Sequence, residues 1–222
     1  CSDCFREGRS GPETELVGLL RALLPDEEIL TSNRDLLGNR QELDIVIPSL
    51  GTAIEFNGVY WHSEAVQTSN DYHAAKSRAA QEKGLRLRHV WEDDWVDRKE
   101  LVVRALAHRL GAAEHLLRAL PDADPTIARR AAARTLTPIQ LDGTRARAFW
   151  QANHLQGPVG SGGYFALVDD ENEIAALLGV GATNHGSRAK AVPGVWDIQR
   201  YATRGIVAGG FTRLLAQATR AL

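Results

Sequence analysis

The chain has 222 residues, which is enough for one large domain or two small ones and for a sizeable hydrophobic core. Hydrophobic residues make up 44% and charged residues 24%, as in ordinary globular proteins, and the formal net charge is −2. This balance excludes a chain that is basic throughout, so any contact with nucleic acid must come from a local patch. No apolar run is long enough to span a bilayer and no signal peptide is visible, so we expect a cytoplasmic protein without a membrane partner.

The only cysteines, Cys1 and Cys4, lie at the start of the chain with the spacing of half a zinc knuckle. Two cysteines are too few for a disulfide framework, and a structural zinc ion needs four ligands. The chain also contains no methionine, so we interpret it as a fragment of a longer protein. Residues 1–9 are then the remnant of a cysteine-rich element.

The N-terminal part of the chain alternates between helical and strand patterns, which predicts an α/β domain at 10–120. Ser10 and Glu13 fit a capping box, Gly84 is typical of a helix end, and the acidic run at 92–94 is typical of a solvated helix start. The predicted elements are a helix at 10–24, a loop at 25–41, strands at 43–47 and 52–57, a helix at 69–83, a strand at 85–91 and a helix at 101–120.

Proline and aspartate punctuate residues 121–126, which are the best candidate for a linker. A smaller α+β domain, incomplete at its C-terminal end, is predicted beyond it at 127–222. Its predicted elements are a strand at 134–139, a helix at 144–154, a hairpin of strands at 164–168 and 174–181, a strand at 195–201, and a glycine turn that opens into a helix at 205–222.

Two carboxylates interrupt the apolar strands of the first domain, Asp44 on one strand and Glu55 on the next. A buried carboxylate without a partner is costly, and two that meet at one sheet edge offer the hard oxygen ligands that Mg²⁺ or Mn²⁺ prefers. Such an ion activates water and stabilises charge during phosphodiester cleavage. Glu55 and Asn57 share one face of their strand because side chains alternate. The pattern is Asp…Glu-x-Lys with Asn57 in place of the lysine, and we expect Asn57 to contact DNA.

Further polar residues extend this candidate site. Lys76 lies three residues after His73 on one face of the predicted helix, and either residue would assist at the phosphate. His62 follows Glu55 by seven residues and would transfer a proton. The competing interpretations are structural: Lys76 as a solvated charge, and Glu13 as part of a helix cap only.

Four segments, LDIVIP, FNGVYWHSE, YHAAK and GLRLRHVWEDDW, resemble in order and spacing the very short patch repair endonucleases and the phage-borne homing endonucleases built on the same nuclease core. The resemblance extends to ETELVGLL and covers about residues 10–96. It implies a restriction-endonuclease-type α/β core, PD-(D/E)XK, that binds Mg²⁺ and cleaves double-stranded DNA in a bacterial or phage-infected cell. In related phage endonucleases a zinc element precedes the nuclease, so Cys1 and Cys4 would bind Zn²⁺ in the full-length parent.

The resemblance also implies residue roles. Asp44 is the central metal ligand, and Glu13, with Glu15 as the alternative, occupies the acidic helix position. His62 matches the family histidine. The aromatic pair Tyr60–Trp61 matches residues that, in the repair enzymes, wedge into the base stack; ordinary core aromatics are the alternative.

The chain departs from the repair enzymes at two positions. They carry a second histidine where this chain has Asn57, and an acidic residue is expected where it has His73. Glu55 is absent from the repair enzymes but suits the homing group. These differences favour a homing-type enzyme.

The second domain has a looser resemblance. Its glycine turn, VAGGFTRLL, offers backbone amides to a phosphate and resembles the pyrophosphate loop of the GCN5-type acetyltransferase fold. It is also similar to a companion domain that follows the nuclease core in some phage proteins. Solvated charge is one interpretation of its arginines, and the other is a basic face for DNA, made by Arg129, Arg130, Arg134, Arg145 and Arg147.

These observations predict a metal-dependent DNA endonuclease, acting as a monomer or a homodimer. Two alternatives stay open. One is a DNA-binding module in which Asn57 marks a lost catalytic lysine. The other is an acyl-CoA-dependent transferase that modifies DNA.

Overall fold

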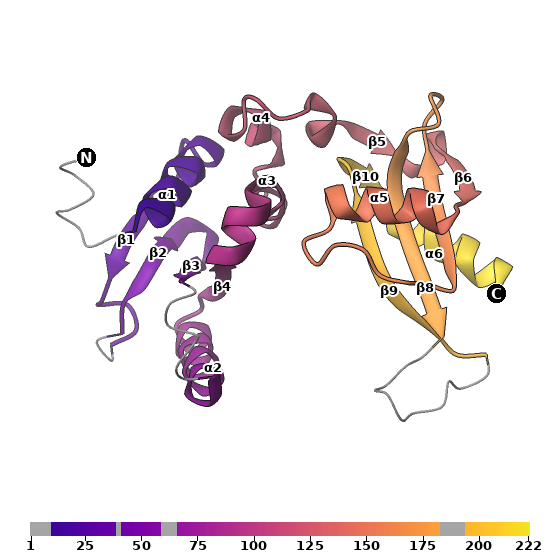
Figure 1. Ribbon diagram of the computed structural model, residues 1–222. Helices are drawn as coiled ribbons and strands as arrows, with labels where there is room; N and C mark the ends of the chain where they lie inside the picture. The colour runs from indigo at the N-terminus through magenta and orange to yellow at the C-terminus, as the bar shows by residue number, and fades with distance from the viewer. Residues whose placement is uncertain (1–9, 39–40, 59–65, 183–193) are drawn as a thin grey trace. The chain divides into compact units, whose positions relative to one another are not determined.

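The chain folds as two units, Cys1–Asp122 and Ala123–Leu222, and both mix helices with β-sheet. The computed structural model describes residues 10–38, 41–58, 66–182 and 194–222, without the side chains of 66–72 (Figure 1). The boundary between the units falls inside the segment at 121–126. Each unit has its own four-stranded sheet, so each is described by itself.

The sheet of the first unit has the strand order β1-β2-β3-β4. Its strands are β1 (Leu30–Asn33), β2 (Leu43–Ile47), β3 (Thr52–Asn57) and β4 (Arg86–Trp91). β2 and β3 form an antiparallel hairpin, closed by the 3₁₀ turn Pro48–Leu50 and by Gly51, whose φ of 52° favours glycine. β4 lies parallel to β3, because a helix carries the chain back between them.

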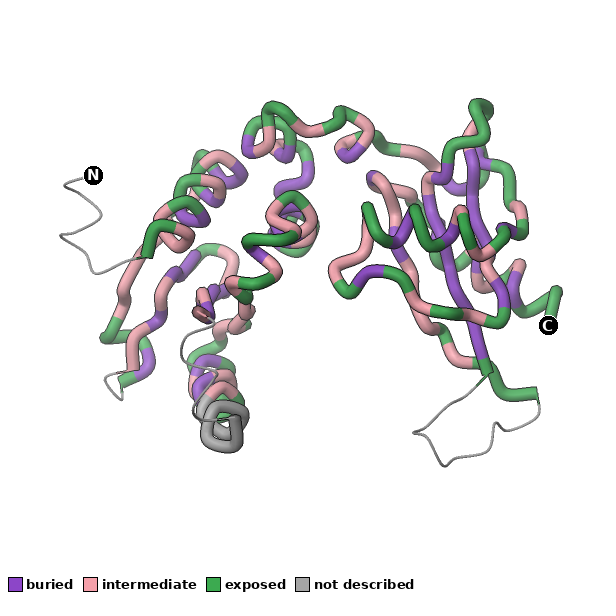
Figure 2. Tube along the Cα trace, in the orientation of Figure 1, coloured by how far each residue is buried: buried purple, intermediate pink, exposed green. Residues whose placement is uncertain are grey.

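Helices cover both faces of this sheet. They are α1 (Gly11–Leu23), α2 (Val66–Glu82), α3 (Glu92–Arg109) and the short α4 (Leu116–Ala119). On one face, Lys76 of α2 reaches Glu55. On the other face, Trp95 of α3 meets the ring of Phe56 edge-on at 6.0 Å. Buried residues of β2 and β3 lie between these layers (Figure 2).

The predicted loop at 25–41 is wrong in its centre, where β1 forms. Its residues are polar apart from Leu30, and all four are only half-buried. β1 is an edge strand that pairs with β2 alone, so backbone pairing rather than an apolar pattern defines it. A sequence pattern based on burial misses such a strand.

The helix predicted at 101–120 also differs from the structure. α3 begins at Glu92, directly after β4, and is kinked at Arg98. It ends before Gly111, whose φ of 74° interrupts the helical run, and a 3₁₀ turn and α4 follow. The acidic residues at 92–94 form the first turn of α3, as predicted.

The sheet of the second unit is antiparallel, with the order β6-β7-β8-β9, and lies between two helices. Phe165 and Leu167 pack in the core that includes Leu214 of α6, whereas Ala166 and Val168 pack in the core on the α5 side. The elements are β5 (Arg130–Ala132), β6 (Thr137–Gln140), α5 (Gly143–Asn153), β7 (Gly163–Val168), β8 (Ile174–Ala182), β9 (Trp196–Thr203), β10 (Ile206–Ala208) and α6 (Gly210–Ala221).

Most predicted elements of this unit are present, and two short strands were missed. β5 and β10 form a separate parallel pair of three residues each, too short to leave a pattern. The strand predicted at 134–139 begins only at Thr137, because residues Ala133–Thr135 form a 3₁₀ turn. In the part of the chain that the structure describes, none of the helices combines the length and apolar character needed to cross a bilayer.

Candidate functional site

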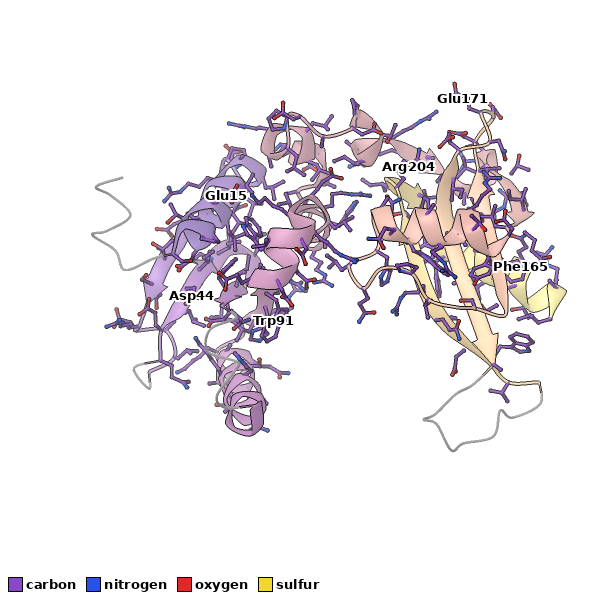
Figure 3. All side chains as sticks on the ribbon, in the orientation of Figure 1. Glu15, Asp44, Trp91, Phe165, Glu171 and Arg204 are labelled. Carbon is purple, nitrogen blue, oxygen red and sulfur yellow. The ribbon has the colours of Figure 1, made fainter. Side chains whose placement is uncertain are left out.

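Asp44 and Glu55 lie on the neighbouring strands β2 and β3, one step beyond the paired residues Ile45 and Ile54. The backbone amide of Asp44 donates a hydrogen bond to Glu55 Oε1 (3.3 Å). The amide of Phe56 donates one to Asp44 Oδ2 (2.8 Å). Backbone donors of the hairpin therefore hold both carboxylates, so the sheet sets their position (Asp44 is labelled in Figure 3).

Lys76 completes a buried charged group with this pair. Its Nζ lies 2.5 Å from Glu55 Oε2, and the two side chains are 5% and 8% exposed. The interpretation of Lys76 as a solvated charge is therefore wrong, whereas its role at the phosphate stays a prediction. His73, Lys76 and Ser77 lie at i, i+3 and i+4 of α2, which brings all three to the face that meets the sheet.

Burial dominates the electrostatics of the two acids. It raises the pKa of Asp44, although the hydrogen bond from Phe56 and the charge of Lys76 act to lower that pKa. Two causes raise the pKa of Glu55 to about 7: burial is the larger, and the negative charge of Asp44 is the next. Lys76 acts to lower that pKa but does not offset them. One cation thus faces two carboxylates, and the group has an excess negative charge when both are ionised.

This excess charge fits a divalent cation. Carboxylate oxygens are the hard ligands that Mg²⁺ and Mn²⁺ take, and a cation beside them would favour the ionised form of Glu55. Across residues 10–38, 41–58, 66–182 and 194–222, no three or more His, Cys, Asp or Glu side chains gather as a metal site. The candidate ligands in the described structure are therefore Asp44 and Glu55, and further ligands would come from water or substrate.

Sequence analysis missed His89, which lies opposite Glu55 in the parallel pair β3–β4. Asn57 Nδ2 lies 3.1 Å from its Nδ1, and Ser77 Oγ lies 3.4 Å from its Nε2. Because the amide of Asn57 donates, the neutral ring carries its proton on Nε2, toward Ser77. Burial, then His73 and Lys76, lowers the pKa of His89 and favours this neutral form. Side chains alternate along the predicted strand at 85–91, so His89 shares a face with Leu85 and Leu87. That alternation is the sequence pattern from which His89 could have been found.

His73 and Trp91 lie beside His89. The ring of His73 meets that of His89 edge-on at 5.2 Å, and that of Trp91 at 5.7 Å. Trp91 stacks on His89 with centroids 6.0 Å apart and an angle of 25° between the planes. The structure therefore places His73 in an aromatic and imidazole group next to the carboxylates.

The two candidates for the acidic helix position, Glu13 and Glu15, have different contacts. The backbone amide of Glu13 donates to Ser10 Oγ (3.2 Å), so Ser10 caps the helix. Glu15 accepts hydrogen bonds from Trp95 Nε1 (3.3 Å) and Lys99 Nζ (2.8 Å), which ties α1 to α3. These contacts lie on the α3 side of the sheet, away from the face where Lys76 meets Glu55.

Several predicted site residues lie outside the described residues. They are the family-type histidine, the aromatic pair before it and the two N-terminal cysteines: His62, Tyr60, Trp61, Cys1 and Cys4. Their roles stay predictions.

In the second unit, the glycine turn leads into α6 through Gly209, which has a φ of 75° and offers no side-chain cap. The backbone amide of Phe211 binds the hydroxyl of Tyr201. A Cβ at Gly210 would lie 2.8 Å from that hydroxyl, so glycine is needed for the close approach. One of the amides on which a phosphate loop depends is therefore already bound within the unit.

Acidic and carbonyl oxygens offset part of the predicted basic face. Arg129 pairs with Asp169 at 3.3 Å, and Arg145 donates to the carbonyl of Asn172 at 2.9 Å. Arg130, Arg134 and Arg147 are exposed. A cavity of about 310 Å³ beside β5 has arginines and acids in its lining, so it does not present one sign of charge.

Compared with protein families, curated proteins and solved structures, the chain shows no significant match. The function is therefore argued from the residues of the first unit.

Proposed function

We propose that the first unit is the catalytic core of a metal-dependent DNA endonuclease of the restriction-endonuclease, PD-(D/E)XK, type. The observation that carries this proposal is the buried group of Asp44, Glu55 and Lys76 on a β-hairpin and its covering helix. Burying three charges is costly in a structural core, and a functional site gives a reason for it. Nuclease cores of this type carry one acidic residue on each of two consecutive strands, as Asp44 and Glu55 do here.

Asp44 and Glu55 would hold the cation, which supplies Lewis acidity and neutralises charge on the phosphodiester. Lys76 keeps Glu55 Oε2 in a fixed position and adds a positive charge beside the reacting phosphate. In this arrangement Lys76 replaces the lysine that the Asp…Glu-x-Lys pattern places at Asn57. Asn57 has a different task, which is to orient His89.

Proton transfer is proposed for His62, on the strength of the resemblance, with His73 as a second group at the phosphate. Tyr60 and Trp61 are proposed to contact DNA, and Glu13 to lie near the site in the DNA complex. The second unit is proposed to position DNA through its exposed arginines. In a full-length parent, Cys1 and Cys4 would help to bind Zn²⁺.

The test is nicking of supercoiled plasmid by the purified chain with Mg²⁺, Mn²⁺ or EDTA. We expect metal-dependent nicking that Asp44→Asn lowers by at least about 100-fold, because it removes a charged ligand and leaves the side-chain shape. Glu82→Gln is the matched control, since Glu82 is an exposed carboxylate at the end of α2. It should nick like the parent chain.

Two outcomes would reject the proposal. Nicking that is equal in Asp44→Asn and the parent chain would place the activity elsewhere. Salt-sensitive DNA binding without nicking in any metal would indicate a binding module that does not cleave.

A further inference from the structure

Two tryptophans near the candidate site, Trp91 and Trp95, differ in how far they are exposed. Trp91, labelled in Figure 3, ends β4 and is 36% exposed, whereas Trp95, one turn into α3, is 1% exposed. Trp95 has the ordinary task of filling the core against Phe56. Trp91 therefore presents a partly exposed aromatic ring beside the buried charges of Glu55 and Lys76.

The Trp91 ring is backed by a rigid partner. It stacks on His89, and His89 is held through both ring nitrogens by Asn57 and Ser77. His73 adds an edge contact to both rings. The ring orientation is thus set before any ligand arrives, which lowers the entropic cost of stacking a planar group on it.

The position of Trp91 relates it to the carboxylates. In the parallel pair β3–β4, Glu55 is opposite His89 and Asn57 is opposite Trp91, all on the face toward α2. One side-chain repeat along a strand, about 6.7 Å, separates the two levels. A nucleotide whose phosphate lies beside Lys76 and the cation that Asp44 and Glu55 would hold can therefore extend its base toward Trp91.

We propose that Trp91 is a stacking platform for a nucleobase of the DNA strand held at Asp44 and Glu55, an inference that rests on the proposed nuclease function. Stacking uses the face of a base, which all four bases share, so the contact tolerates sequence. It requires a base that is unstacked from its duplex neighbours.

Local charge favours a base over the backbone at this point. Glu92, Asp93 and Asp94 follow Trp91 directly and form the first turn of α3. These acids repel a phosphate but not an uncharged base. The platform and the acidic turn together would direct the base toward Trp91 and leave the phosphate beside Lys76 and the cation that Asp44 and Glu55 would hold.

The experiment compares binding of two probes by the full chain: an oligothymidylate and an abasic deoxyribose-phosphate strand of equal length. Affinity is measured with Ca²⁺ in place of Mg²⁺, beside the plasmid nicking assay. We expect Trp91→Ala to weaken oligothymidylate binding by roughly 5- to 100-fold and to leave abasic binding unchanged. Trp91→Phe should restore most of the loss. Trp196→Ala, which removes a tryptophan that is 42% exposed in the second unit, is the matched control.

The outcomes separate the two proposals. Equal oligothymidylate affinity in Trp91→Ala and the parent chain, with nicking intact, would overturn the platform alone. An equal loss for both probes would also overturn it, because the effect would not depend on a base. No binding of either probe by the parent chain, together with no nicking, would overturn both the platform and the nuclease.

Discussion

Lys76 is the residue on which the charge balance of the first unit depends. It is a buried cation beside two buried carboxylates: it pairs directly with Glu55, and its charge also acts on Asp44, which accepts a hydrogen bond from the backbone amide of Phe56. The Asp…Glu-x-Lys pattern located the acids but placed the cation at Asn57. In the structure the buried lysine comes from helix α2, away from the strand that carries Glu55.

Lys76→Met should destabilise the first unit by about 3 kcal/mol at pH 8, because it leaves two buried acids without their cation. The loss should be smaller at pH 5, where Glu55 can take up a proton. Chemical unfolding followed at both pH values measures it. Lys83→Met is the control and should change stability by less than about 0.5 kcal/mol, since Lys83 is exposed. Equal effects of the two substitutions would show that Lys76 is not part of a buried charged group.

Glu55 should make the metal-free chain less stable as the pH rises. Its folded pKa of about 7 lies above its ordinary value of 4.5, so protonation favours the folded state. This contribution is full below about pH 4.5 and is lost as the pH passes 7. Its size is at most about 3.5 kcal/mol, because one pKa unit corresponds to about 1.4 kcal/mol.

The measurement is the free energy of unfolding between pH 4.5 and 8 in EDTA, for the parent chain and for Glu55→Gln. The glutamine variant should lose most of the slope, because its side chain does not titrate. A slope that is the same in both chains would assign the pH dependence to other groups.

At the scale of elements, the buried strands and the turns between them were predictable from the sequence, whereas the short edge strands were not. β2 and β3 were predicted with their observed bounds, because apolar runs between Pro, Gly and Asn leave a strong local pattern. β1, β5 and β10 were missed, since short edge strands are defined by the partner that binds their backbone.

Gly179 shows how one element depends on another. A Cβ at this position of β8 would lie 2.4 Å from the ring of Trp150 on α5 and 2.7 Å from Ser161 Oγ. The close packing of α5 on the sheet therefore requires glycine here. This requirement is invisible in the sequence of β8 alone, because it arises from a residue on α5.

At the scale of the whole molecule, the two units should unfold as separate transitions, because each has its own sheet and core. Gly179→Ala should lower the stability of the second unit by about 1–3 kcal/mol through overpacking against Trp150. Differential scanning calorimetry should show one transition move and the other stay. Gly160→Ala, at a position with open space for a Cβ, is the control. A single transition that moves as a whole would contradict independent units.

The sequence by itself determined the α/β character of the chain, the segment that divides it and the two strand acids, Asp44 and Glu55. Each of these depends on local composition and on the period of two along a strand, which are readable without knowing the fold. Only the tertiary structure decided that Lys76 meets Glu55 and that His89 and Trp91 lie beside them. Those residues come from different elements, and their meeting depends on how α2 crosses the sheet and on the register of β3 with β4.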